Sequence, residues 1–217
     1  MKKAPRIRGG IAIRSVCLVV GLAVIAAGIV AMLVSGLGVP PWDVLHVGIA
    51  LHTPLSVGEA TVVVGLLVLG VGWAVGATPG VGTVANAIEI GLLVDVFRSL
   101  SWVEDLAGAG LLPRLGLVVF GVVCFGVGSA LYIGAGLGAG PRDGLMLVLA
   151  HRTGRRIALV RGMMEVVVLL VGAVLGGPVG IGTAAFALTV GPAVEACFWL
   201  MVRAGLATPP SVRIPVP

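Results

Sequence analysis

The chain contains two copies of one pattern, 100 residues apart, and this duplication restricts its possible folds more than any other feature. Gly36-Leu37-Gly38, Pro41, Asp43 and Thr53 align without a gap with the same residue types at 136–138, 141, 143 and 153. Gly80, Gly82 and Thr83 align in the same way with Gly180, Gly182 and Thr183. Shared proline, aspartate and threonine positions do not result from richness in apolar residues, so we interpret the chain as a duplicated unit.

Each unit contains three apolar segments that are long enough to cross a membrane, which takes about 20 mainly apolar residues. They lie at 15–34, 58–77 and 82–97 in the first half, and at 113–135, 158–176 and 182–203 in the second. The whole chain is 59% hydrophobic and 11% charged, whereas soluble domains average roughly 45–50% and 25%. The sequence therefore predicts an all-α membrane protein of about six transmembrane helices.

Two short segments that begin with a proline, 41–52 and 141–152, are too brief and too polar to cross. We expect each to form a half-helix that lies at the interface or dips into the protein and returns, since irregular backbone at membrane depth must be satisfied by protein or by a watery cavity. The predicted organisation is a tail at 1–10, repeat 1 at 11–98, a loop at 99–112, repeat 2 at 113–203 and a tail at 204–217.

Three crossings per unit are an odd number, so the second copy should be inverted in the membrane relative to the first. Positively charged residues near helix ends favour the cytoplasmic side. The first helix is preceded by Lys2, Lys3, Arg6, Arg8 and Arg14, and Arg203 and Arg213 follow the last one. The connection 35–57 has no Lys or Arg, whereas its copy at 135–161 carries Arg142, Arg152, Arg155, Arg156 and Arg161. We therefore expect a bacterial inner-membrane protein with both termini in the cytoplasm.

The segments GLGVPPWDVLHVGIALHT and GLGAGPRDGLMLVLAHRTG, each followed by a PGVGT- or VGIGT-type turn, carry a resemblance to a known family. With these motifs the chain, from about residue 10 to 203, resembles the YczE/YitT-like family of bacterial multi-spanning membrane proteins. The resemblance implies a transporter or permease, without an agreed substrate or catalytic residue.

Four carboxylates are candidates for binding a solute or ion. Asp43 and Asp143 lie in the first turn of each short helix, where they either complement the helix dipole or face a cavity and bind a cation or proton. Glu89 and Glu165 lie inside predicted spans, where ionisable groups usually face the bundle interior. Arg161 could pair with Glu165, four residues on, and this pairing would make Glu165 structural. For Asp95 and Glu195, near helix ends, snorkelling or capping is favoured at least as much as a functional role.

The repeated glycines predict structural roles. Gly80, Gly82 and Thr83, with Gly180, Gly182 and Thr183, should form tight turns in which glycine adopts positive backbone angles and threonine caps the next helix. Gly72-x-x-x-Gly76 and Gly172-x-x-x-Gly176 should allow close helix packing, within the bundle rather than in a dimer.

Other residue types support neither a metal site, a cofactor nor an enzyme. The cysteines Cys17, Cys124 and Cys197 lack metal or disulfide spacing, and His46, His52 and His151 are interpreted as interfacial. Trp42, Trp102 and Trp199, near span ends, are interpreted as interface anchors. The absence of a nucleophile–base pair argues against catalysis.

The sequence thus favours a small secondary transporter or permease with its site between the repeats, by analogy with other inverted-repeat proteins. Its partners would be the lipid bilayer and a small solute or ion, without nucleic acid, and a homodimer is an open alternative. A different class is a membrane protein that anchors or regulates a partner complex through Arg152, Arg155 and Arg156.

Overall fold

The structure is a computed structural model that describes residues 5–101, 103, 106–108 and 110–209. Lys2, Lys3, Trp102 and Arg213, which the sequence interpretation used, lie outside these residues. The elements in chain order are β1 (Arg6–Ile7), α1 (Ile11–Ser35), α2 (Pro41–His52), α3 (Val57–Ala74), α4 (Val81–Arg98), the 3₁₀ turn η1 (Leu106–Gly108), α6 (Leu111–Ala135), α7 (Pro141–Thr153), α8 (Ile157–Val174), α9 (Ile181–Arg203) and β2 (Ala207–Thr208).

Five helices are long and apolar enough to cross a membrane: α1, α3, α6, α8 and α9. The sixth predicted span, α4, has the required length but carries Glu89, Asp95 and Arg98 within its 18 residues. Large apolar side chains cover the outer surface of the spans; Val174 and Leu188, for example, are 87% and 77% exposed. Such a surface is stable in lipid rather than in water.

The two short helices match the predicted segments closely. α2 covers Pro41–His52, and α7 covers Pro141–Thr153, one residue more than expected. Each begins with its proline at the first helical position, where the missing N–H is no loss. α2 stops because Thr53 turns extended ahead of Pro54, whereas α7 stops at Gly154, which has φ 64°.

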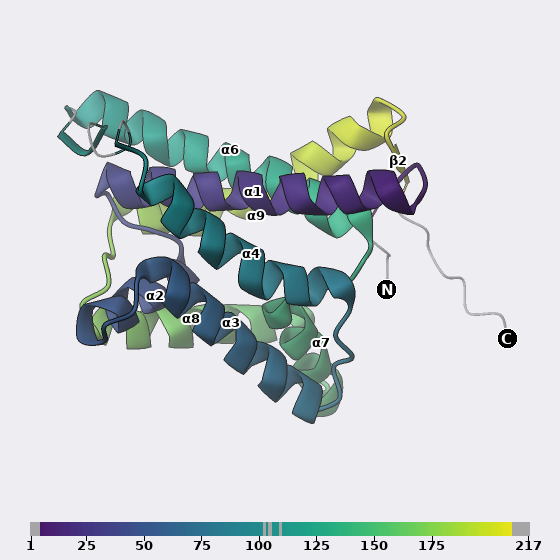
Figure 1. Cartoon of the computed structure of the whole chain (residues 1–217). Coiled ribbons are helices and arrows are strands. Elements are labelled where there is room, and N and C mark those ends of the chain that lie inside the picture. The colour runs from purple at the N-terminus through teal and green to yellow at the C-terminus, as the bar shows by residue number, and fades with distance from the viewer. Residues whose placement is uncertain (1–4, 102, 104–105, 109, 210–217) are drawn as a thin grey trace, which may run out of the picture.

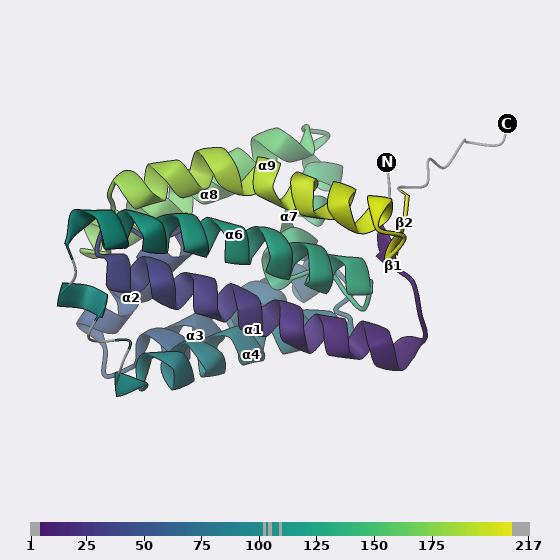
Figure 2. The same ribbon diagram turned by 90° about the horizontal axis from the view of Figure 1, so that it is seen from above.

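The helices form two layers that α4 connects (Figure 1). α9, α6, α1 and α4 follow one another side by side, as Figure 2 shows from above, while α2 packs on α8 and α3 on α7 in the other layer. Each short helix thus packs against a long helix of the opposite half. α4 also packs on α3 and so joins the layers.

α1 and α6, the first helices of the two halves, cross in close contact because glycines face each other. A Cβ on Gly21 would lie 2.7 Å from the carbonyl oxygen of Gly128, and one on Gly28 would lie 3.0 Å from that of Gly121. Gly28 and Gly128 are equivalent in the repeat, as are Gly21 and Gly121. Such small-residue contacts let helix backbones approach in lipid.

Arg14 and Arg114, another repeat pair, bind the opposite ends of these two helices. Arg14, near the start of α1, donates from Nε to the carbonyl oxygen of Ala135 at 2.6 Å and from Nη2 to that of Gly136 at 2.9 Å. Arg114, near the start of α6, donates from Nε to the carbonyl oxygen of Ser35 at 2.5 Å. α1 and α6 therefore run antiparallel, and each guanidinium meets the negative end of the other helix dipole.

The Gly-x-Gly-Thr segments serve a different purpose from the one predicted. Gly80 and Gly180 have φ −100° and −167°, so positive backbone angles are not the reason for glycine. Instead, each segment packs against the Gly-Leu-Gly segment of the opposite half. The N–H of Gly82 donates to the carbonyl oxygen of Leu137 at 3.0 Å, and the N–H of Gly182 donates to the carbonyl oxygen of Leu37 at 2.7 Å. A Cβ on either segment would collide with that backbone.

In these same segments Thr83 and Thr183 cap the helices from their first turn. The Oγ1 of Thr83 accepts the N–H of Gly80 at 2.9 Å, and that of Thr183 accepts the N–H of Gly180 at 3.2 Å. The cap position itself is glycine rather than threonine, so the hydroxyl reaches back across the first turn.

The Gly-x-x-x-Gly pairs are not helix-packing motifs, contrary to the prediction. α3 ends at Ala74 and α8 at Val174, so Gly76 and Gly176 lie beyond the helices, with φ 102° and 77°. The tightest contact is made by the first glycine of the second pair, because a Cβ on Gly172 would lie 2.5 Å from the backbone nitrogen of Leu45 in α2. Gly72 lies beside α7 in the equivalent contact.

The two ends of the described chain meet. β1 and β2 pair antiparallel, with Arg6 opposite Thr208 and Ile7 opposite Ala207. This pair lies at one end of the helices, next to the end of α6 (Figure 1). Both ends of the described part of the chain therefore lie on the same side of the molecule.

Candidate functional site

A cavity of about 240 Å³ lies where the two halves meet. Its wall comes from the first turns of α2 and α7, from α4 and α6, and from the facing sides of α8 and α9. The polar and charged side chains that line it are Asn86, Ser129, Tyr132, Arg142, Asp143, Arg161 and Glu165. For a membrane-spanning chain with 11% charged residues, this is a concentrated set.

A smaller cavity of about 30 Å³ is its counterpart in the repeat. Asp43, His46, Thr61 and Gly65 line the small cavity where Asp143, Met146, Arg161 and Glu165 line the large one. The same correspondence between the small and the large cavity holds for four more pairs of lining residues: Ile29 and Ser129, Val64 and Met164, Asn86 and Phe186, and Ile90 and Val190. The halves thus contribute equivalent positions to two cavities with different side chains.

Trp42 and Arg142, equivalent residues at the starts of α2 and α7, lie between these cavities and line both. The guanidinium carbon of Arg142 lies 5.2 Å from the centre of the Trp42 ring, a cation–π distance. Trp42 is buried, so its interpretation as an interface anchor is wrong; Trp199, 55% exposed, fits that role. The tryptophan orients the arginine at the contact between the two short helices.

The small cavity is narrow because α3 packs tightly on α4. A Cβ on Gly65 would lie 3.4 Å from that of Ala87, and Gly58 and Gly91 are in backbone contact. In the second half Glu165 replaces Gly65, and a Cβ on Gly191 would meet nothing within 4 Å. α8 and α9 are therefore separated where α3 and α4 touch, and the large cavity occupies the space.

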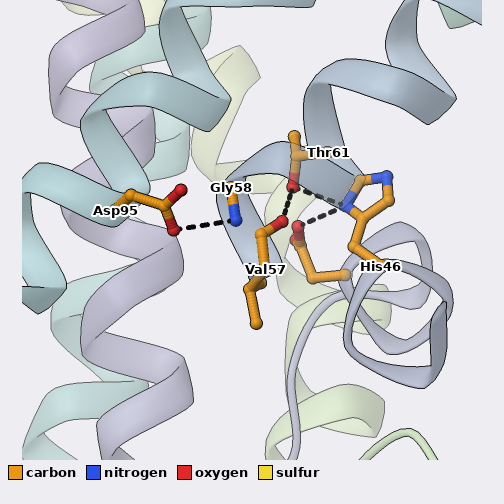
Figure 3. Close-up of polar contacts among 6 residues, drawn as sticks. His46, Val57, Gly58, Thr61 and Asp95 are labelled. Atoms are coloured by element: carbon orange, nitrogen blue, oxygen red, sulfur yellow. Dashed lines mark hydrogen bonds and ion pairs between the residues drawn. The ribbon is translucent and has the colours of Figure 1, made fainter. Parts of the chain in front are cut away.

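Asp43 and His46 form a buried pair within the first two turns of α2, and Figure 3 shows His46 beside Thr61. The Nδ1 of His46 lies 3.1 Å from Oδ1 of Asp43 and 3.2 Å from Oγ1 of Thr61. Thr61 donates its hydroxyl hydrogen to the carbonyl oxygen of Val57, so the network assigns a proton to Nδ1 of His46. The interfacial interpretation of His46 is wrong; the spacing of three residues from Asp43 on one helix could have indicated the pair.

Asp143 lies in an oxygen-rich corner of the large cavity. A Cβ on Gly140 would lie 2.7 Å from the Tyr132 hydroxyl, 3.2 Å from Oδ2 of Asp143 and 3.6 Å from Oδ1 of Asn86. Tyr132 is 4% exposed, and its hydroxyl lies near the Asp143 carboxylate and the Gly140 backbone but makes no hydrogen bond of normal geometry to any described residue. Sequence reasoning missed Tyr132 because its repeat partner, Met32, gives no polar pattern.

The other predicted carboxylates are distributed unevenly. Glu165 lines the large cavity, but no ion pair within 4.0 Å joins it to Arg161 in the described part of the chain. Glu89 lines neither cavity, and its buried Oε1 has no hydrogen-bond partner among the residues described.

Asp95 is a capping residue. It accepts the hydroxyl of Ser56 and the N–H of Gly58 at 3.0 Å, so it holds the start of α3 against the end of α4 (Figure 3). Its repeat partner Glu195 is exposed on α9. Within residues 5–101, 103, 106–108 and 110–209, no three His, Cys, Asp or Glu side chains are grouped as a metal site would require.

These helices and cavities define a multi-pass α-helical membrane protein. The chain belongs to the family of unknown function DUF6198, whose model matches residues 12–198. It is 35% identical over 181 residues to the uncharacterized membrane protein YczE of Bacillus subtilis, covering 79% of each chain. It is also 35% identical over 189 residues to an uncharacterized protein of Haemophilus influenzae, covering 87% of this chain and 84% of the relative.

A second Bacillus subtilis protein, the uncharacterized protein YyaS, is 26% identical over 171 residues, which cover 76% of this chain and 82% of the relative. The resemblance to YczE-like proteins is thereby confirmed. No solved structure matches the chain.

Proposed function

We propose that this protein is a small-solute transporter of the bacterial inner membrane, built from two inverted repeats of three spans each, with α4 as the sixth span. The antiparallel contact of α1 and α6 through Arg14 and Arg114 supports the inversion. Arg152, Arg155 and Arg156 are exposed at the end of α7 and in the loop before α8. In Figure 1, α7 lies at the same end of the molecule as β2. By the positive-inside rule this end is cytoplasmic, with both termini.

The observation that carries the proposal is the pair of repeat-equivalent cavities, one large and one small. Transporters with inverted repeats move a solute by exchanging the conformations of their halves around a site near the bilayer midplane. Arg161 and Glu165 belong to the first half of α8, which begins at the proposed cytoplasmic end, so the large cavity faces inward. Thr61 and Gly65 hold the equivalent positions in α3, so the small cavity faces outward.

Cysteine accessibility tests this exchange. In a background without Cys17, Cys124 and Cys197, single cysteines replace Met164 in the large cavity and Val64 at the equivalent position. A membrane-impermeant maleimide is applied to inside-out and right-side-out vesicles. We expect Met164→Cys to react from the cytoplasmic face and Val64→Cys, more slowly, from the outer face. A protein with one static cavity would leave Val64→Cys unreactive from both faces, and reaction of both from one face would refute the inversion.

A cross-link sharpens the result. Cysteines at Gly65 and Ala87 would have Cβ atoms 3.4 Å apart, close to the usual separation in a disulfide. Oxidation should fix α3 against α4, block the labelling of Val64→Cys and leave that of Met164→Cys unchanged.

The exposed arginines at 152, 155 and 156 also suit the alternative of docking a partner complex or anionic lipid. Neutralising all three separates the functions: a docking protein would lose its partner, whereas a transporter would keep two-sided accessibility.

A further inference from the structure

The large cavity holds four charged groups that do not neutralise one another. Arg142, Asp143, Arg161 and Glu165 line it, and no ion pair within 4.0 Å joins any of them in the described residues. Charges at membrane depth are costly unless they are paired or hydrated. Two guanidiniums and two carboxylates that share one cavity therefore favour a ligand that carries both signs of charge.

The Tyr132 hydroxyl adds a second, independent feature. It belongs to a residue that is 4% exposed, lines the cavity and has no hydrogen-bond partner in the described part of the chain. Leaving a buried hydroxyl without a partner costs about 1–3 kcal/mol. Together with the carboxylate of Asp143 and the amide oxygen of Asn86, it surrounds Gly140 with oxygen atoms, which suit an ammonium group.

Arg142 supplies the complementary group. Its guanidinium lies over Trp42, at the start of α7, where helix N–H groups also favour negative charge. A guanidinium presents a fork of donors that matches a carboxylate. The edge-to-face pair of Phe125 and Phe186, with ring centres 4.6 Å apart, supplies an apolar wall.

Resting on the proposed transport function, we propose that the cavity binds a small zwitterion, an amino acid or a compound of that class. Its carboxylate binds Arg142, its ammonium group binds between Asp143 and the Tyr132 hydroxyl, with Glu165 nearby, and its apolar part lies against Phe125 and Phe186.

Binding to the full-length protein in lipid nanodiscs tests this class. Each of the twenty standard amino acids is added at millimolar concentration while thermal unfolding is followed. For any that stabilises the protein, titration calorimetry compares it with its deaminated acid, its decarboxylated amine and sodium chloride alone. We expect at least one zwitterion to bind. Each of its two analogues should bind at least about tenfold more weakly, a loss of binding free energy of about 1.4 kcal/mol or more.

Variants connect the binding to the residues. Tyr132→Phe removes only the unpartnered hydroxyl and should weaken the zwitterion about tenfold. Arg142→Gln should remove the preference for the zwitterion over the amine, while Arg152→Gln, exposed on the same helix, should bind as the unmodified protein does.

Three results would overturn the inference: no amino acid shifts unfolding, the amine or sodium alone matches the zwitterion, or Tyr132→Phe and Arg142→Gln bind like Arg152→Gln. Two-sided cysteine accessibility would survive each of these results, so loss of the ligand class is distinguishable from loss of the transport proposal.

Discussion

Replacing Arg14 with methionine removes the contact that joins the start of α1 to the end of α6. Arg14 is 9% exposed and makes two hydrogen bonds to backbone carbonyls, whereas Arg114 makes one and is half-buried. Methionine keeps the apolar stem and deletes the charge. We therefore expect both substitutions to destabilise the protein, and Arg14→Met to do so more.

The magnitude follows from the number of bonds and the solvent. A hydrogen bond to a charged group contributes about 1.5–3 kcal/mol in water-soluble proteins, which sets an upper bound of about 3–6 kcal/mol for two. Hydrogen bonds between membrane helices average only about 0.6 kcal/mol, because the unfolded state in the membrane also finds partners. We expect a loss of about 1–3 kcal/mol for Arg14→Met and about half of that for Arg114→Met.

Reversible unfolding in mixed SDS micelles measures these losses. Arg8→Met, which removes an exposed charge from the same end of the chain, controls for net charge. Arg14→Lys should recover less than half of the stability, since an ammonium group cannot reproduce the geometry of the guanidinium fork. The explanation fails if Arg14→Met is no less stable than Arg8→Met, or if Arg14→Lys equals the unmodified protein.

Two further predictions concern packing and capping. Gly21→Leu should lower the free energy of unfolding by about 1–3 kcal/mol or prevent folding, because its Cβ would lie 2.7 Å from the carbonyl oxygen of Gly128. In the same unfolding assay Gly70→Leu should be neutral, because a Cβ on Gly70 would meet nothing within 4 Å. Asp95→Ala should cost about 1–2 kcal/mol because the N–H of Gly58 and the hydroxyl of Ser56 lose their acceptor at the start of α3. The loss is measurable as faster amide exchange at the first turn of α3, and Glu195→Ala should change neither quantity.

Much of the architecture could be predicted from the sequence because a gapless duplication forces equivalent elements. The short helices begin at Pro41 and Pro141 as expected, since proline fixes the first helical position. The repeat also implied reciprocal contacts between halves. Arg14 and Arg114 could have been recognised as such a pair, because both are single cations near the start of an apolar helix at the repeat offset.

The purpose of the repeated glycines could not be predicted from the sequence alone. Gly-x-Gly-Thr has the composition of a tight turn, and its pattern contains no information about which backbone lies opposite. Gly80 and Gly180 are required because Leu137 and Leu37 approach from the other half, a contact between segments more than 50 residues apart. Small residues serve both close approach and positive angles, so only the packing separates the two reasons.

The candidate site lies where equivalent positions of the two halves carry different residues. Positions with the same residue in both halves include Asp43 and Asp143, but the glycines among these positions mainly hold the halves together. The two cavities differ because Thr61 and Gly65 in the first half correspond to Arg161 and Glu165 in the second. Gly65 allows α3 to pack closely on α4. Glu165, at the equivalent position in α8, adds side-chain volume and a charge, and this charge must be hydrated or paired. In a duplicated membrane protein, the retained positions therefore indicate the symmetric frame, and the exchanged polar positions indicate where a ligand of defined charge would bind.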